Sequence, residues 1–380
     1  MSEIGTLPPP SFDQRYSYTL ADEAKARDPK QTGLSFVGHQ YGAAGANDRY
    51  DEGLGTLGLR HHTGIQLAKR VALMGHVMDK RSDGLQSVHL LNMTNRIIEN
   101  AEVPSVLPAE GIVATDPLSQ KTATKIAAGW LHDIVEDHPN KLLTLLGREN
   151  EPAKGPLTSI LRRLPNTRLT ETYLKYKDAK HTRALGLTAI SEIWSQETAD
   201  LVKKVSNPIP LIDTPRVKDW LYRRHLKKTV AKDKDALEIK AYDLDHNAGQ
   251  NHRTANAEKQ LRGDIKYSRA IPPLYKLLAR NGLSHLTDLM KTAEAGCKNR
   301  IEQYREKHPN GPSVKKIVKM GAKALKGTDL PPPDTGEPKM SDKEVDIAFK
   351  SFTDTLNAGD WSLTYVPDDL KIDNQFNRSA

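Results

Sequence analysis

The nine residues from Gly129 to Asp137 constrain the fold more than any other part of this chain, because they place acidic and imidazole side chains inside a strongly apolar stretch. On a helix, His132 and Glu136 lie one above the other, since residues four apart share a face. Asp133 and Asp137 form a second pair of the same kind. Apolar side chains fill the rest of the segment: Ile126, Ala127, Leu131, Ile134 and Val135. The segment therefore predicts a helix packed against a core, with one polar edge that can hold a metal ion or transfer protons.

A second group of acidic residues lies far downstream, in residues 237–247. An imidazole and a carboxylate from the first helix, one carboxylate from this segment and one more histidine would complete a site for a divalent cation. Positions would remain for water and substrate oxygens. His62 is the histidine that we favour, because it precedes a helical pattern that includes Leu67, Ala68 and Val71. His61 is the alternative ligand.

At four places in order, the chain resembles the HD-domain metal phosphohydrolases, and within them the hydrolase domain of the RelA/SpoT alarmone enzymes and the small alarmone hydrolases. The first three places are His62 with Leu67-Ala68, the Leu-His-Asp-x-x-Glu-Asp pattern of residues 131–137, and the Val205-Ser206 turn. The fourth is residues 239–247, which are similar to the family pattern Ile-Lys-Leu-Ala-Asp-x-x-His-Asn. The resemblance covers roughly residues 55–285, and nothing downstream resembles an alarmone synthetase.

This resemblance implies a helical bundle of the HD-domain type, with helical insertions, and one activity. That activity is removal of the 3′-pyrophosphate from guanosine tetra- or pentaphosphate, assisted by one divalent metal ion, for which manganese is expected. The implied metal ligands are His62, His132, Asp133 and Asp243. Glu136 and Asp137 would orient or deprotonate the attacking water, and Asn247 would lie near the ribose or the scissile phosphate.

A basic segment just before residue 243 is a candidate for holding substrate phosphates. Thr214 and Pro215 predict the start of a helix there. Its basic residues are Arg216, Lys218, Arg223, Arg224, Lys227 and Lys228. Lys218 and Arg223 are the two that we expect to bind the substrate. The alternative is that this helix presents an ordinary solvated face.

Because the chain departs from the family pattern at several places, its substrate can differ from the alarmone. The spacings from His62 to His132 and from Asp137 to Val205 are longer than in the small alarmone hydrolases, and insertions at such places often shape a pocket. Tyr242 also places a bulky phenol beside the expected ligand. The alternative substrate is therefore another nucleotide: a deoxynucleotide, a cyclic nucleotide or an oligonucleotide.

Three residues at the end of the fourth motif have alternative roles. His246 is expected to be structural, because it would be one ligand too many. Asp245 is expected to lie at the surface or behind the ligands. Asn247 could equally cap a backbone turn.

The net charge of +8 favours anionic partners, but it fits a phosphorylated nucleotide, nucleic acid or an acidic surface equally well. A non-catalytic module that binds such a partner through its basic surface is therefore the second class of function. The single Cys297 excludes an internal disulfide. With no signal-peptide pattern and no apolar run of membrane-spanning length, a membrane is not an expected partner and the cytoplasm is the expected location. The oligomeric state is left open.

Helical periodicity dominates from about residue 60 to 285 and strand-like alternation is scarce, so the sequence predicts an all-α protein. We expect a partly disordered N-terminal arm at 1–50 and the HD-type domain at 51–285. A basic helical extension at 286–328, a Pro-rich linker at 329–340 and a C-terminal tail at 341–380 complete the chain. One amphipathic helix is expected in the tail, at 342–356.

Overall fold

The computed structural model describes residues 44–76, 80–81, 84–104, 112–148, 168–249 and 257–325. Over these residues the chain is helical, apart from loops and one antiparallel pair of two-residue strands, β1 (Lys80–Arg81) and β2 (Gly84–Leu85). The predicted all-α class is confirmed for this part of the chain. The predicted Pro-rich linker and C-terminal tail, with its expected helix, lie outside the described residues, as does the predicted arm up to residue 43.

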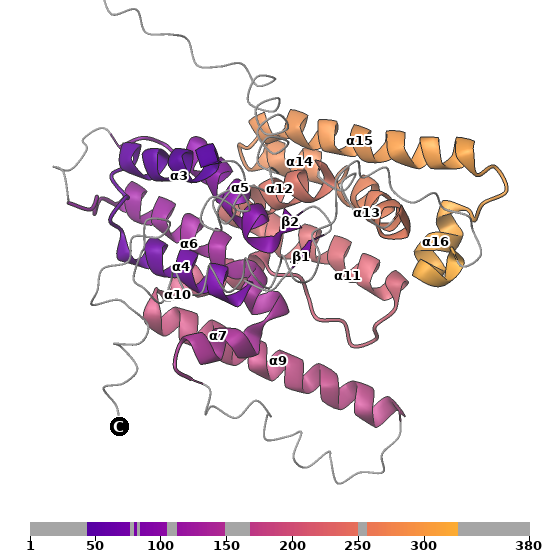
Figure 1. Ribbon diagram of the computed structural model, residues 1–380, viewed down its shortest axis with the longest axis horizontal. Coiled ribbons are helices and arrows are strands. Elements are labelled where there is room, and N and C mark those ends of the chain that lie inside the picture. The colour runs from indigo at the N-terminus through magenta and orange to yellow at the C-terminus, as the bar shows by residue number, and fades with distance from the viewer. Residues whose placement is uncertain are drawn as a thin grey trace, which may run out of the picture.

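Helices make up most of the described part of the chain. The first six are α3 (Ala44–Thr56), α4 (Thr63–Gly75), α5 (Gln86–Glu99), α6 (Pro117–Asp137), α7 (Pro139–Leu145) and α9 (Arg168–Ile193). They are followed by α10 (Gln196–Val205), α11 (Pro215–Lys228), α12 (Lys234–Gly249), α13 (Ala257–Ala270), α14 (Leu274–Arg280), α15 (His285–Lys307) and α16 (Val314–Met320). Two short 3-10 turns are η1 (Val230–Lys232) and η3 (Gly321–Ala324). Figure 1 shows α15 and α9 on opposite sides of the molecule, with α5, α6 and α12 between them.

Local capping explains where several of these helices begin. Asp116 caps α6, with Oδ1 accepting hydrogen bonds from two backbone N–H groups of the first turn, each at 3.0 Å. Thr214 caps α11 in the same way and is followed by proline, so the helix start predicted at Thr214 and Pro215 is confirmed. Ser195 caps α10. Such side-chain caps satisfy N–H groups that the helix itself cannot pair.

Helix α6 forms the centre of one half of the molecule. It packs against α4, α5 and α10, and its apolar side chains are buried as predicted. Trp130 donates its Nε1–H to the hydroxyl of Tyr50 on α3, at 2.9 Å. Gly129 allows α5 to approach closely, because a Cβ at this position would lie 2.9 Å from Cδ1 of Ile97. The polar edge of α6 is thus held in place by packing on its other sides.

Helix α12 is the second central helix, and it carries buried charges rather than only apolar groups. It packs against α5, α10 and α15. Glu238, Lys240, Asp243 and Asp245 on this helix are all buried. Because α5 contacts both α6 and α12, the polar edges of three helices meet at one place.

Helix α15 joins the same core, although the extension was predicted to start at residue 286. It packs along α12 and α13, and Met290, Ala293 and Cys297 are buried with the core of the preceding helices. A smaller apolar cluster joins α13, α15 and α16 through residues that include Ile265, Ile301 and Ile317. No helix within the described ranges is both long and apolar enough to span a lipid bilayer.

Candidate metal centre

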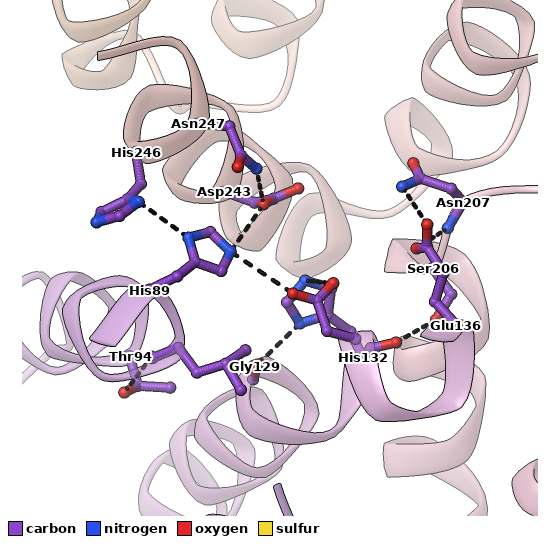
Figure 2. A network of polar contacts seen from close by, with 12 residues as sticks. His89, Thr94, Gly129, His132, Glu136, Ser206, Asn207, Asp243, His246 and Asn247 are labelled. Carbon is purple, nitrogen blue, oxygen red and sulfur yellow. Dashed lines mark hydrogen bonds and ion pairs between the residues drawn. The ribbon is translucent and has the colours of Figure 1, made fainter. Parts of the chain in front are cut away.

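Two histidines and an aspartate converge where α5 meets α6. His89 comes from α5, and His132 and Asp133 come from α6. One ligand atom from each of the three lies within 4.8 Å of the others, so these residues can hold a metal ion. Both imidazoles are almost fully buried, with 1% of His89 and 0% of His132 exposed. Figure 2 shows His89 in the middle of the network, between His246 on one side and His132 on the other.

Asp243 on α12 adds a fourth group to this cluster. Its Oδ1 lies 3.2 Å from Nε2 of His89. Nε2 of His89 lies 3.7 Å from Oδ2 of Asp133, and Nε2 of His132 lies 2.9 Å from Oδ1 of Asp133. Ligands bonded at about 2.1 Å to one octahedral ion are about 3 Å apart when adjacent and about 4 Å apart when opposite. The group of His89, His132 and Asp133 therefore fits one first-row divalent cation, with Asp243 beside it as a candidate fourth ligand.

The ring of His132 is oriented by the backbone of its own helix. Its Nδ1 lies 2.9 Å from the carbonyl oxygen of Gly129, so Nδ1 carries a hydrogen and donates it. In the neutral ring, Nε2 then carries the lone pair and faces Asp133. A histidine fixed in this manner by its second nitrogen is the arrangement that metal-binding histidines usually show.

His89 is oriented by another histidine. Its Nδ1 lies 2.9 Å from Nδ1 of His246, and one of these two nitrogens must donate to the other. For His89 to present a lone pair at Nε2, its own Nδ1–H has to be the donor. His246 therefore lies behind His89 and supports it, consistent with the structural role predicted for His246.

Asp243 is held by two neighbours on its own helix. Nζ of Lys240 lies 2.5 Å from Oδ2, and the amide of Asn247 donates to Oδ1 at 2.5 Å. Figure 2 shows Asn247 directed at this carboxylate. The predicted substrate residue Asn247 thus holds the candidate ligand Asp243 in this structure.

Buried charges set the protonation of the cluster. Burial alone would lower the pKa of His132, but Asp133 and Asp243 outweigh it and raise that pKa to about 9. Burial would raise the pKa of Asp133, yet the imidazoles of His132 and His89 hold it below its usual range. The pKa of Asp243 is likewise lowered, because Lys240 and His89 outweigh its burial. Two ionised carboxylates in a buried place favour a cation there, and a proton on His132 competes with it.

Asp137 lies one turn beyond Asp133, at the exposed end of α6. Partial loss of hydration at its carboxyl group raises the pKa to about 6, and the charges of Asp133 and Glu136 act in the same direction. A carboxyl group that titrates this close to neutrality can accept a proton from water and release it again.

Glu136 has a different environment from the one predicted for a catalytic base. Its Oε2 accepts the backbone N–H of Asn207 at 2.8 Å, and its Oε1 accepts the side-chain amide of Asn207 at 2.7 Å. Ser206 adds a hydrogen bond to the carbonyl oxygen of His132 at 3.0 Å. Helix α10 ends at Val205, as the predicted turn requires, and the loop that follows is tied to α6 through Glu136.

The structure places His89, and not the predicted His62, in the group that can hold a metal. His62 caps helix α4, where its Nδ1 accepts the N–H of Ile65 at 3.3 Å. Among the described residues, the metal-capable group contains His89 and neither His62 nor His61. One sequence signal pointed to His89: the spacing from His62 to His132 exceeded the family norm, and His89 shortens it.

The two basic residues predicted to bind the substrate have partners of their own. Nζ of Lys218 lies 2.6 Å from Asp213 on an exposed surface. Arg223 donates to Asp219 through Nε and Nη2, at 3.2 and 3.0 Å. Among the contacts of the described residues, neither Lys218 nor Arg223 touches His89 or His132.

Comparison with known proteins adds no family to this geometry. No family model, no curated protein and no solved structure matches the chain. The function has therefore to be inferred from the residues of the cluster itself.

Proposed function

We propose that this protein is a metal-dependent phosphohydrolase of the HD type, with His89, His132, Asp133 and Asp243 as the metal ligands. The observation that carries this proposal is the meeting of two buried imidazoles and the carboxylate of Asp133 at ligand distances, with the carboxylate of Asp243 in contact with His89. Their order along the chain, a histidine, a His-Asp pair and a distant aspartate, agrees with the pattern that the sequence resembles. Mn²⁺ is the cation that we expect from that resemblance.

The residues around the ligands support hydrolysis rather than simple storage of a cation. A bound divalent cation would polarise a phosphoryl oxygen and lower the pKa of a water molecule. Asp137, with its pKa of about 6, would accept the proton of the attacking water. Lys240 and Asn247 keep Asp243 in place, and Glu136 fixes the loop that begins at Ser206.

A phosphorylated nucleotide is the proposed substrate, and the 3′-pyrophosphate of guanosine tetra- or pentaphosphate is the preferred bond. Support comes from the motif order and from the positive net charge of +8. Another nucleotide remains the alternative within the same chemistry. The cytoplasmic location is proposed on the sequence pattern alone.

The two histidines that compete for the first ligand position provide the sharpest test. We expect Mn²⁺, titrated into the purified full chain by calorimetry, to bind the wild type and the His62→Ala variant alike. Loss of the cap in His62→Ala should cost only about 1 kcal/mol of stability. In His89→Ala, Mn²⁺ binding should fall by at least tenfold, while circular dichroism shows that the helices remain.

The same three proteins should then be offered guanosine tetraphosphate, GTP, dGTP and a short single-stranded oligonucleotide. GDP and pyrophosphate from the first substrate, lost in His89→Ala and kept in His62→Ala, would support alarmone hydrolysis. Cleavage of another substrate would keep the mechanism and change the nucleotide. Activity that survives His89→Ala but not His62→Ala, or no cleavage of any of the four, would contradict the proposal.

A non-catalytic binding module is the second candidate, and one surface feature favours it. Helix α11 exposes 49% of Trp220, and the guanidinium of Arg224 lies 5.1 Å from the centre of its ring. An exposed aromatic ring beside basic side chains can stack on the bases of single-stranded nucleic acid. Oligonucleotide binding that weakens steeply with salt and is insensitive to chelators would favour this function.

A further inference from the structure

Next to Asp243, three helices bring two lysines to one buried tyrosine. Tyr222 on α11 is 6% exposed. Nζ of Lys240, from α12, lies 5.8 Å from the centre of its ring, and Nζ of Lys266, from α13, lies 4.3 Å from it. Nζ of Lys266 also lies 5.1 Å from the ring centre of Tyr267. Lys266 is therefore held against two aromatic rings, close to a lysine that contacts a candidate metal ligand.

The cations in this neighbourhood differ in how their charge is balanced. Lys240 forms an ion pair with Asp243. Arg223 and Arg269 share the carboxylate of Asp219, at 3.0 and 3.2 Å. Within the part of the chain that the structure describes, Lys266 forms no ion pair with any carboxylate. Aromatic rings attract an ammonium group but do not neutralise it, so the charge of Lys266 stays available to an anion.

The ring of Tyr222 brings Lys266 near Lys240, because both ammonium groups lie against it. Burial lowers the pKa of Lys266, and the nearby ammonium of Lys240 lowers it further. Asp243 and Glu136 act in the opposite direction, so Lys266 lies within reach of the charges of the cluster. A half-buried lysine that has lost hydration and has a second cation beside it gains most from binding an anion.

We infer that Lys266, positioned by Tyr222 and Tyr267, is an anion-binding residue that contacts a phosphoryl group next to the one held at the metal centre. The inference rests on the proposed function for the identity of the anion as a phosphate of substrate or product. Lys240 contacts Asp243 and Lys266 does not, so Lys266 lies farther from the ligands. Two linked phosphoryl groups could bind the centre with one group and Lys266 with the other.

Calorimetry with inorganic pyrophosphate tests this subsite in the full chain. The wild type, Lys266→Met and Lys266→Arg would be compared in the presence of Mn²⁺. Lys276→Met serves as the matched control, because Lys276 is an exposed lysine on the neighbouring helix α14. We expect pyrophosphate binding to weaken about tenfold or more in Lys266→Met, since a hydrogen bond to a charged group is lost. Lys266→Arg should restore most of the affinity, and Lys276→Met should match the wild type.

A merely structural role for Lys266 predicts a different pattern. The melting temperature would fall in Lys266→Met while pyrophosphate affinity stayed within twofold of the wild type, and this result would overturn the inference. A wild type that binds no pyrophosphate would overturn it as well.

The failure of this inference can be told from the failure of the proposed function. Mn²⁺ bound through His89, together with unchanged pyrophosphate affinity in Lys266→Met, would remove the subsite and keep the metal centre. Pyrophosphate bound through Lys266 by a protein that binds no Mn²⁺ would keep the subsite and remove the metal centre.

Discussion

Two groups of buried charged side chains in the described part of the chain are arranged in opposite ways. Between α13 and α15, both carboxylate oxygens of Asp264 accept hydrogen bonds from Arg300, at 2.7 to 3.1 Å. Arg300 also donates to the carbonyl oxygen of Ala248 at 2.9 Å. Where α5, α6 and α12 meet, His89, His132 and Asp133 instead direct their ligand atoms into one shared space, and Asp243 contacts His89.

The difference separates a pair that holds helices together from a group of residues that can do chemistry. The Asp264–Arg300 pair matches donors to acceptors and needs nothing further. The cluster around His132 balances two carboxylates with a proton on an imidazole and with the ammonium of Lys240. A divalent cation can replace that proton, whereas it has no place in the matched pair.

The largest effect on activity is expected from a change at Asp137, at the exposed end of α6. Replacing it by asparagine removes the proposed proton acceptor and should lower kcat/KM by about 10²- to 10⁴-fold, the usual contribution of general acid–base catalysis. Because the pKa of Asp137 is raised to about 6, the carboxylate needed as a base is lost as the pH falls through 6. The wild-type rate should therefore fall on the acidic side of about pH 6, and this limb should be absent in Asp137→Asn.

Asp200→Asn is the matched control, because Asp200 is a carboxylate on α10 whose side chain accepts a hydrogen bond from Gln196. It should leave the rate and the pH profile unchanged. Mn²⁺ affinity should also stay within a few-fold of the wild type in Asp137→Asn. An unchanged acidic limb in Asp137→Asn would assign the proton transfer to another group.

The second largest effect is a loss of stability on breaking the Asp264–Arg300 pair, which should not change the candidate metal centre. Arg300→Met leaves the carboxylate of Asp264, of which 1% is exposed, without its charged partner. Breaking a buried pair from one side typically costs about 3–5 kcal/mol. We expect a lower denaturation midpoint in urea and unchanged Mn²⁺ affinity. The double variant Asp264→Asn/Arg300→Met should recover part of the loss, and a loss of Mn²⁺ binding in either protein would show that the two places are coupled.

A smaller effect is expected from the histidine behind His89. His246→Phe keeps a ring at this position but removes the nitrogen that pairs with Nδ1 of His89. Loss of such a supporting hydrogen bond typically weakens metal binding by about 10- to 100-fold. Calorimetry with Mn²⁺ should show this decrease, and the melting temperature should change little. An unchanged Mn²⁺ affinity would mean that α5 alone orients His89.

The parts of the site that were predictable from the sequence are those set by local geometry. His132, Asp133, Glu136 and Asp137 occupy one helix, and their spacing of four residues fixes their relation before any tertiary contact forms. The same is true of Asp243 and its helix neighbours. The all-α class followed from apolar periodicity for the same reason.

The parts that the sequence did not predict depend on long-range packing. His89 joins the cluster because α5 packs between α6 and α12, and nothing near residue 89 shows this contact. Glu136 was expected to orient or deprotonate the attacking water. In the structure its hydrogen bonds go to Asn207, which lies 71 residues farther along the chain. The place of α15 in the core depends in the same way on its packing with α12 and α13.

A third buried charge, Lys69, provides the last and smallest test of the comparison. It is 2% exposed, and its ammonium lies 4.4 Å from the ring centre of Tyr50. Burial lowers its pKa to about 8, against a weaker opposing effect of Asp51. Below pH 8 the folded protein holds a buried charge, while between pH 8 and the ordinary lysine pKa of about 10.4 only the unfolded chain keeps the proton. Stability should thus rise with pH across this window.

Lys69→Met removes that buried charge and keeps a side chain of similar length. We expect it to stabilise the protein at pH 7 by about 1–2 kcal/mol, because the cost of the charge outweighs a cation–π contact of about 1 kcal/mol. The advantage should shrink as the pH rises from 8 and be gone near pH 10, as urea unfolding at several pH values would show. Destabilisation at pH 7 would instead place Lys69 with the Asp264–Arg300 pair, as a charge that the fold requires.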